Sequence, residues 1–204
     1  METYYHINKS DTCDWKTGDE IDFEGKTNYY WNSLAEKGDL IQINGKTHSS
    51  DLIVRKALNC YLRKEMPPME MKGYHFNPLR TLTESTDSLG NALRINREVI
   101  FESIRKESYP KLPSRKKSFW LMPNNDESLN FWNGILQGNK HKIFKVTING
   151  KIHRSPQKWL IGGTFSINQW EDLAHKYWLG KDVGNYDDEI LLEGSLKIVE
   201  EITV

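Results

Sequence analysis

The chain has 204 residues, enough for one well-buried domain, and 37% of them are hydrophobic. Its 28 basic and 28 acidic side chains cancel at pH 7, which argues against a protein that coats nucleic acid by bulk charge. It contains no apolar run of about 18 residues and no secretory signal pattern, so we expect a cytoplasmic protein without a membrane span. Cys13 and Cys60 are expected to be free thiols, and no metal-ligand spacing is present, so we predict no metal site.

The first half of the chain predicts a strand, a hairpin and a helix. Residues 4–7 predict a short strand. Residues 37–48 predict a hairpin, because this segment contains an Asn-Gly pair, a strong two-residue turn signal. A helix capped by Ser50 or Asp51 should follow. Its apolar face comprises Val54, Leu58, Tyr61 and Leu62. Residues 66–94 have no steady hydrophobic period and predict a long connection.

The next elements alternate between helix and strand. Residues 95–107 predict a helix that ends before two prolines, and residues 114–122 predict a strand that begins basic and becomes apolar. A helix capped by Asp126 should follow. Its apolar face comprises Leu129, Trp132 and Leu136. Residues 143–148 predict a strand, and the Asn-Gly pair at 149–150 predicts a second hairpin turn.

The last helix has the most complete set of sequence signals. Ser166 and Gln169 form the S-x-x-Q pattern of a capping box, and Phe165 and Trp170 are spaced for a hydrophobic staple. Gly180 is placed to end the helix. The apolar residues of this helix are Trp170, Leu173, Ala174, Tyr177 and Trp178. Because hairpins interrupt any regular alternation of strands and helices, the order favours an α+β fold over a doubly wound parallel sheet.

A carboxylate cluster precedes the last apolar strand, Ile190–Leu192. Side chains alternate faces along a strand, so Asp187 and Glu189 should point the same way, with Cα atoms roughly 6.5 Å apart. Such a pair can polarise a sugar hydroxyl and orient a nucleophile. The alternative is a solvated strand start, because carboxylates are usually exposed.

Two further segments are candidates for ligand binding. His6, on the first strand, can donate a hydrogen bond to a ligand hydroxyl as a neutral imidazole, or can be an ordinary surface or core histidine. Arg115 follows Ser114 and offers a planar fork for a pyrophosphate, unless this basic segment is a solvated turn. Phe119 or Trp120 can stack on a flat ring such as nicotinamide.

Taken in order, these elements resemble the ADP-ribosyltransferase superfamily in its histidine-first branch, which includes diphtheria-toxin-like enzymes, poly-ADP-ribose polymerases and DarT-type bacterial toxins. They also resemble an uncharacterised bacterial domain family with Tyr-His, Pro-Ser-Arg and Glu-Ile-Leu-Leu motifs. The matching segments are Tyr5-His6, Pro113-Ser114-Arg115, Phe119-Trp120-Leu121, Phe131-Trp132, Tyr177-Trp178 with Gly180, and Glu189-Ile190-Leu191-Leu192. Residues 15–95 carry no match.

The resemblance implies two facing antiparallel sheets with an NAD+ cleft between them, in a single domain over residues 1–204. Residues 49–110 would form a helical and loop insertion between the first and second core strands. His6 would bind an NAD+ ribose hydroxyl, and Glu189 would be the catalytic glutamate that stabilises the oxocarbenium-like transition state. Asp187 would guide the acceptor. Residues Tyr5, Ser114, Arg115, Phe119 and Trp120 would complete the cofactor site.

The sequence therefore leads us to expect a mono-ADP-ribosyltransferase that consumes NAD+ without a metal and modifies a protein or nucleic acid. The family resemblance further implies a toxin of a bacterial defence or toxin–antitoxin system, with an antitoxin protein as partner. Two alternatives stay open: an NAD+ glycohydrolase on the same fold, and a non-catalytic module that binds a nucleotide or a partner.

Overall fold

The computed structural model describes residues 2–9, 13–22, 26–36, 40–43, 46–65, 78–135 and 141–202. The chain divides into two compact units. The first comprises residues 1–28, 97–161 and 165–204, and the second comprises residues 29–96 and 162–164. Helices and antiparallel strands are mixed along the chain, so the expected α+β class is confirmed.

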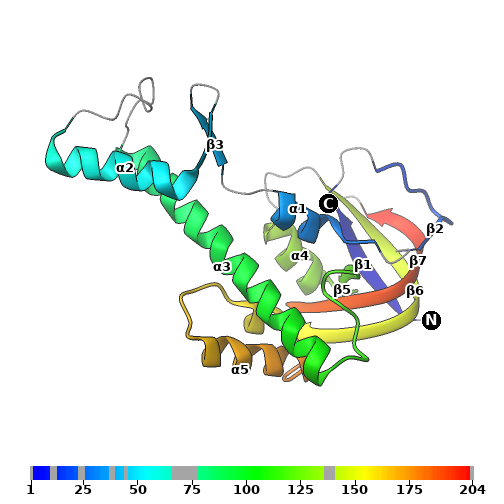
Figure 1. The fold of residues 1–204 in the computed structure, drawn as a ribbon. Helices are drawn as coiled ribbons and strands as arrows, with labels where there is room; N and C mark the ends of the chain where they lie inside the picture. The colour runs from blue at the N-terminus through cyan, green and yellow to red at the C-terminus, as the bar shows by residue number, and fades with distance from the viewer. Residues whose placement is uncertain are drawn as a thin grey trace. The chain divides into compact units, whose positions relative to one another are not determined.

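The first unit is built around an antiparallel sheet of five strands, drawn in Figure 1. The strands are β1 (Thr3–Asn8), β2 (Glu20–Asp22), β5 (Phe119–Pro123), β6 (Lys142–Pro156) and β7 (Asp188–Ile202). Their order is β2-β7-β5-β1-β6, and β6 also pairs with β7 along almost its whole length. This second pairing closes the sheet, because it joins β6, at one end of the strand order, to β7, near the other end.

Two facing glycines allow β6 and β7 to pass from one part of the sheet to the other. Gly150 and Gly194 are cross-strand partners with φ of 146° and 153°, a region that favours glycine. A Cβ on Gly150 would lie 2.3 Å from the Glu193 carbonyl oxygen. The hairpin turn predicted at residues 149–150 is therefore wrong: Gly150 permits close approach of two backbones within a continuous strand.

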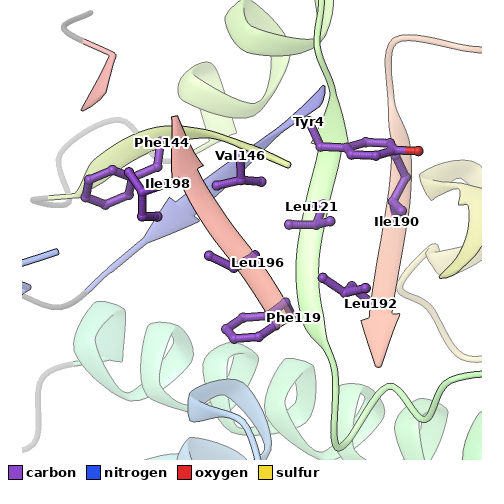
Figure 2. Close-up of a cluster of buried hydrophobic side chains, with 9 residues drawn as sticks. All are labelled: Tyr4, Phe119, Leu121, Phe144, Val146, Ile190, Leu192, Leu196 and Ile198. Carbon is purple, nitrogen blue, oxygen red and sulfur yellow. The ribbon is translucent and has the colours of Figure 1, made fainter. Parts of the chain in front are cut away.

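One face of the sheet carries a core to which β1, β5, β6 and β7 all contribute; we call this the inner face (Figure 2). Its buried members are Tyr4, Phe119, Leu121, Phe144, Val146, Ile190, Leu192, Leu196 and Ile198. Trp15 and Ile21 pack against the same cluster. Because residues from both halves of β7 meet here, the side chains of the inner face converge on a single core.

The opposite, outer face is covered by helices. Phe101 of α3 (Pro78–Ser108) packs with residues of α5 (Ile167–Trp178) and with Leu191 of β7. Leu129 and Trp132 of α4 (Asp126–Ile135) pack against β1 and β5. Residues 157–160 form a short 3₁₀ helix between β6 and α5.

The local signals of α5 are confirmed in full. Ser166 and Gln169 form the capping box, and the rings of Phe165 and Trp170 lie 5.0 Å apart at the staple position. Gly180 has φ of 60° and its N–H donates to the Tyr177 carbonyl. The predicted cap of α4 is displaced by one residue, because Asn125 Oδ1 accepts from the backbone N–H of Ser128 at 2.8 Å.

The long connection predicted at residues 66–94 is wrong from residue 78 onward, where α3 begins with Pro78 at a position that favours proline. The described side chains from Thr83 to Arg97 are half-buried or exposed, so this part of the helix has no buried stripe to produce a hydrophobic period. Residues 66–77 lie outside the described part of the chain.

The second unit contains α1 (Tyr29–Glu36), β3 (Leu40–Ile43), β4 (Lys46–Ser49), α2 (Ser50–Arg63) and the start of α3. Strands β3 and β4 pair antiparallel, which confirms the first hairpin. The cap of α2 is Ser49 rather than Ser50 or Asp51. The face predicted for α2 is buried at Val54 but exposed at Leu58, Tyr61 and Leu62.

Two further observations bear on the class of protein. None of the helices in the described ranges is both long and apolar enough to cross a lipid bilayer. Cys13 and Cys60 are free and partly exposed.

Candidate functional site

The predicted site residues are divided between the two faces of the sheet. His6 pairs with Leu121, which pairs with Ile190, so these three side chains share the inner face. Glu189 precedes Ile190 and therefore points to the outer face, where it contacts Tyr177 of α5. The structure thus does not bring the side chains of His6 and Glu189 to one face.

His6 is buried among aromatic rings. Its ring stacks on Trp15 at 5.5 Å between centroids and meets the edge of Phe119 at 5.7 Å. Nδ1 lies 2.9 Å from the Trp120 carbonyl, which can only accept, so Nδ1 carries the proton. Burial lowers the pKa of His6 to about 4, although the hydrogen bond to Trp120 acts to raise it. The neutral ring therefore presents Nε2 as an acceptor, whereas the sequence led us to expect a donor.

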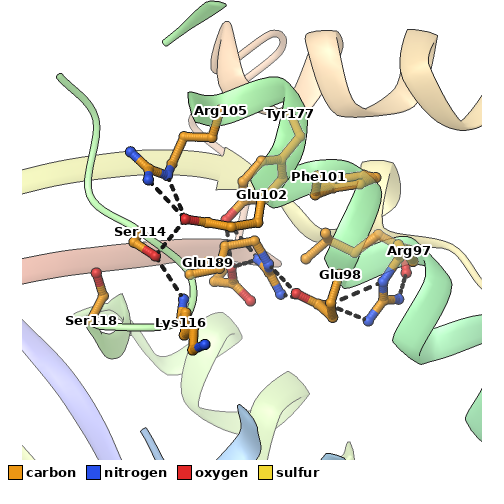
Figure 3. Close-up of polar contacts among 12 residues, drawn as sticks. Arg97, Glu98, Phe101, Glu102, Arg105, Ser114, Lys116, Ser118, Tyr177 and Glu189 are labelled. Atoms are coloured by element: carbon orange, nitrogen blue, oxygen red, sulfur yellow. Dashed lines mark hydrogen bonds and ion pairs between the residues drawn. The ribbon is translucent and has the colours of Figure 1, made fainter. Parts of the chain in front are cut away.

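The outer face holds a buried ionic network centred on Arg115. Figure 3 labels its partners Glu98, Tyr177 and Glu189. Arg115 Nε donates to Glu98 Oε2 at 2.8 Å, and Nη1 donates to the Tyr177 hydroxyl at 2.7 Å and to Glu189 Oε1. The Tyr177 hydroxyl in turn donates to Glu189 Oε1 at 2.6 Å. The guanidinium also lies 5.0 Å from the centroid of the Trp120 ring.

Charge pairing keeps Arg115 and Glu98 ionised despite their burial. Burial alone would lower the pKa of Arg115, but Glu189 and Glu98 raise it well above its ordinary value. Burial acts to raise the pKa of Glu98, but Arg115 and Arg97 outweigh it and the pKa is lowered. Burial and Glu189 raise the pKa of Tyr177 well above its ordinary value, so its hydroxyl is protonated. With Arg97 included, two guanidinium groups pair with the two carboxyl groups of Glu98 and Glu189, so the ion pairs are matched in number.

Arg115 and Ser114 are not arranged for a pyrophosphate. The guanidinium of Arg115 is 1% exposed and faces two carboxylates, which repel an anion. The Ser114 hydroxyl donates to Glu102 Oε1 at 2.9 Å, and Glu102 is also paired with Arg105. These residues form a second polar cluster beside the Arg115 network (Figure 3).

The remaining predicted residues have separate surroundings. Tyr5 lies in the core between the sheet and α4, on the face opposite to His6. Phe119 lies on the inner face beside His6, whereas the Trp120 ring lies on the outer face over Arg115. Asp187 precedes the first residue of β7, and its carbonyl accepts from the Gln157 N–H at 3.2 Å.

Three functional candidates escaped the sequence reasoning. Glu98 and Tyr177 are brought to Arg115 by helices that are distant in the sequence. No local signal marks Glu98, and Tyr177 belonged to a matching segment but was given no role in the site. Asp188 could have been found, because alternation along β7 places it on the face of Ile190 and His6, opposite to Glu189. Across the described ranges, no three or more His, Cys, Asp and Glu side chains gather in an arrangement that could hold a metal ion.

The fold and site thus define an α+β protein with a closed antiparallel sheet, a buried histidine on its inner face and an ionic network on its outer face. The chain belongs to the family described as "Protein of unknown function (DUF2441)", whose model matches residues 4–204. It is also similar to Noggin of Gallus gallus, with 32% identity over 66 residues. That match covers 31% of this chain and 27% of Noggin.

Mild acid should destabilise the protein through two buried histidines. Burial lowers the pKa of both His6 and His153 from 6.5 to about 4, and His153 Nε2 donates to the Tyr177 carbonyl. Between these values the unfolded chain binds protons that the folded chain does not, so stability falls as the pH drops from 6.5 to 4. We expect a loss of about 3 kcal/mol for each ring by pH 4.

Urea unfolding at several pH values measures this loss. The double variant His6→Asn, His153→Asn should show a much flatter dependence of the unfolding free energy between pH 6.5 and 4.5. An unfolding free energy for the wild type that is the same at pH 7 and pH 5 would contradict the assignment.

Proposed function

We propose that this protein is a mono-ADP-ribosyltransferase that binds NAD+ on the inner face of the sheet and breaks its nicotinamide–ribose bond. The observation that carries the proposal is the state of His6: a neutral, oriented ring on β1 with Nε2 as an acceptor, beside flat aromatic groups. A ribose hydroxyl is a suitable donor to Nε2. The resemblance implies two facing sheets, whereas the described strands of the first unit form one five-stranded sheet in which β6 also pairs with β7.

The nicotinamide ring has two aromatic candidates for stacking in this proposal. Trp15 and Phe119 both lie within 6 Å of the His6 ring, measured between centroids. Trp120, by contrast, stacks with Arg115 on the other face. Because Trp15 already stacks on His6, a ligand that reaches His6 must displace or share that indole ring.

Glu189 takes a supporting place in this proposal. Its side chain points away from His6 and is 4% exposed, with Oε1 held by Arg115 and Tyr177. It therefore fixes the beginning of β7 against α3 and α5. A direct catalytic role for Glu189 would require a substrate on the outer face.

The acceptor and the biological setting follow from the family resemblance alone. We propose a protein or nucleic acid as acceptor, a cytoplasmic site of action and a role as a toxin of a bacterial defence or toxin–antitoxin system, controlled by an antitoxin protein.

Labelled NAD+ tests this function. Purified protein should bind NAD+ in calorimetry, and label from the adenine half should appear on macromolecules of a bacterial lysate. His6→Asn retains a donor for the Trp120 carbonyl but removes the Nε2 acceptor, so we expect about tenfold weaker binding. His48→Ala, in the second unit, is the matched control and should leave binding unchanged.

The same experiment separates the alternatives. Label released only as free ADP-ribose would indicate an NAD+ glycohydrolase. Binding without release of nicotinamide would indicate a nucleotide-binding module, a second candidate favoured by the burial of Glu189 and its position opposite to His6. Absence of both binding and turnover would overturn the proposal.

A further inference from the structure

We propose that residues 13–19 form a lid over His6 and that Trp15 occupies the place of a flat ligand ring on the inner face. The lid is closed in this structure, and a ligand binds only after the indole of Trp15 has moved away from His6. This inference rests on the proposed function, because NAD+ is the ligand that the open lid would admit, and it adds the step that controls access to the site.

Trp15 is packed against His6 as a ligand ring would be. Its ring stacks on the His6 ring at an interplanar angle of 25°, with centroids 5.5 Å apart, and lies 5.7 Å from the ring of Phe144. Phe144 and Phe119, both labelled in Figure 2, belong to the buried core of the inner face. His6 is only 9% exposed in this arrangement, so a dinucleotide in solution cannot reach Nε2 while the indole is in place.

The segment that carries Trp15 lies mainly at the surface. Asp14 and residues 16–19 are exposed, whereas Cys13 and Trp15 are half-buried and pack against the core of the inner face. Because the His6 ring is neutral, its stacking with the indole lacks the attraction of a cation for an aromatic face. Burial of apolar surface therefore holds the indole in place, and a flat ring of a ligand can replace that contact.

A turn at residues 16–19 fixes one end of the lid. Lys16 N donates to Asp19 Oδ2 at 2.8 Å, and Asp19 N donates to the Lys16 carbonyl at 3.0 Å. Gly18 has φ of 95°, a conformation that favours glycine, and its N–H donates to the Ile198 carbonyl of β7 at 2.9 Å. The turn therefore holds the chain to β7 close to Trp15 and acts as the hinge of the lid.

The exposed side chain of Asp19 allows the lid to be weakened at its hinge rather than at the ligand. The apparent affinity for a ligand is reduced by the fraction of molecules whose lid is open, so a change that favours the open lid raises the affinity. Asp19→Ala removes the acceptor of Lys16 N, whereas Asp19→Asn retains an amide oxygen that can accept the same hydrogen bond.

Calorimetry with NAD+ compares the wild type with the lid variants. We expect about threefold tighter binding for Asp19→Ala and at least about tenfold tighter binding for Trp15→Ala, because both changes favour the open site. Asp19→Asn should bind as the wild type does. Asp14→Ala removes the same charge from an exposed position of the same segment, so it is the matched control and should leave binding unchanged. Thermal unfolding of each variant monitors the fold.

Fluorine NMR follows the lid without any ligand. Labelling with 5-fluorotryptophan marks the seven indoles of the chain, and Trp15→Phe identifies the resonance of Trp15. We expect this resonance to shift toward the value of a solvent-exposed indole in Asp19→Ala, and also when NAD+ binds to the wild type.

The two measurements separate the lid from the proposed function. Weaker binding of NAD+ by Trp15→Ala would mean that the indole stacks on the ligand, which would overturn the inference but leave the proposed function intact. Equal affinities of Asp19→Ala and Asp19→Asn, or bound NAD+ with an unchanged Trp15 resonance, would do the same. If the wild type and all variants fail to bind NAD+, the proposed function is overturned. The Trp15 resonance of Asp19→Ala then decides the lid: a shift supports it, and an unchanged resonance overturns it.

Discussion

Arg115→Met should lower the free energy of unfolding by about 3–5 kcal/mol, the usual cost of removing one partner from a buried ion pair. The substitution leaves the carboxyl groups of Glu98, at 0% exposure, and Glu189, at 4%, without the guanidinium that pairs with both. It also leaves the Tyr177 hydroxyl with one partner fewer. Urea unfolding followed by tryptophan fluorescence measures the loss.

Neutral carboxamides should restore part of this stability. The triple variant Arg115→Met, Glu98→Gln, Glu189→Gln removes the unpaired charges, so we expect it to be more stable than Arg115→Met alone. Lys117→Met, an exposed lysine two residues along the same turn, is the control and should change stability by less than about 0.5 kcal/mol. A loss below 1 kcal/mol for Arg115→Met would show that the network does not hold the outer face together.

The elements that sequence reasoning identified are those with complete local signals. The capping box of Ser166 and Gln169, the alternation in β1 and the Asn-Gly hairpin before Lys46 each depend on neighbours within a few residues. Such signals determine backbone geometry directly, so they survive in the folded chain.

The errors arose where long-range pairing decides the structure. The Asn-Gly pair at Gly150 has the composition of a turn, but Gly194, 44 residues later, makes it a point of backbone contact within β6. In α3 the described side chains from Thr83 to Arg97 are half-buried or exposed and gave no hydrophobic period, whereas Glu98, Phe101 and Glu102 are buried. Local composition cannot reveal which distant segment will become a partner.

The residues of the candidate site also depend on pairing between distant segments, which local sequence patterns do not reveal. The sequence located the strands that carry His6 and Glu189, but the face on which each side chain lies depends on the register of β5 between them. A shift of one residue in either pairing would place Glu189 instead of Asp188 on the inner face with His6. Which of these two carboxylates shares a face with His6 therefore depends on the register, which only the folded sheet resolves.

Gly194→Ala should be the most damaging small substitution in the sheet. A Cβ on Gly194 would lie 2.2 Å from the Asn149 carbonyl oxygen and 2.8 Å from the Gly150 Cα, both backbone atoms. Its φ of 153° is also strained for any residue with a side chain. Because neither strand can retreat without breaking ladder hydrogen bonds, we expect a loss of about 3 kcal/mol or more in the free energy of unfolding.

Gly134→Ala provides the matched control, since a Cβ at this helical position meets no atom within 4 Å. It should be neutral or stabilise by up to about 1 kcal/mol, because alanine favours helix and restricts the unfolded chain. Chemical unfolding of both variants compares the same chemical change at two positions. Equal stability of the two would mean that β6 and β7 do not approach closely at Gly150 and Gly194. Without that approach the two halves of each strand could not contribute to one closed sheet, and the inner face that carries His6 and Asp188 would lose its shape.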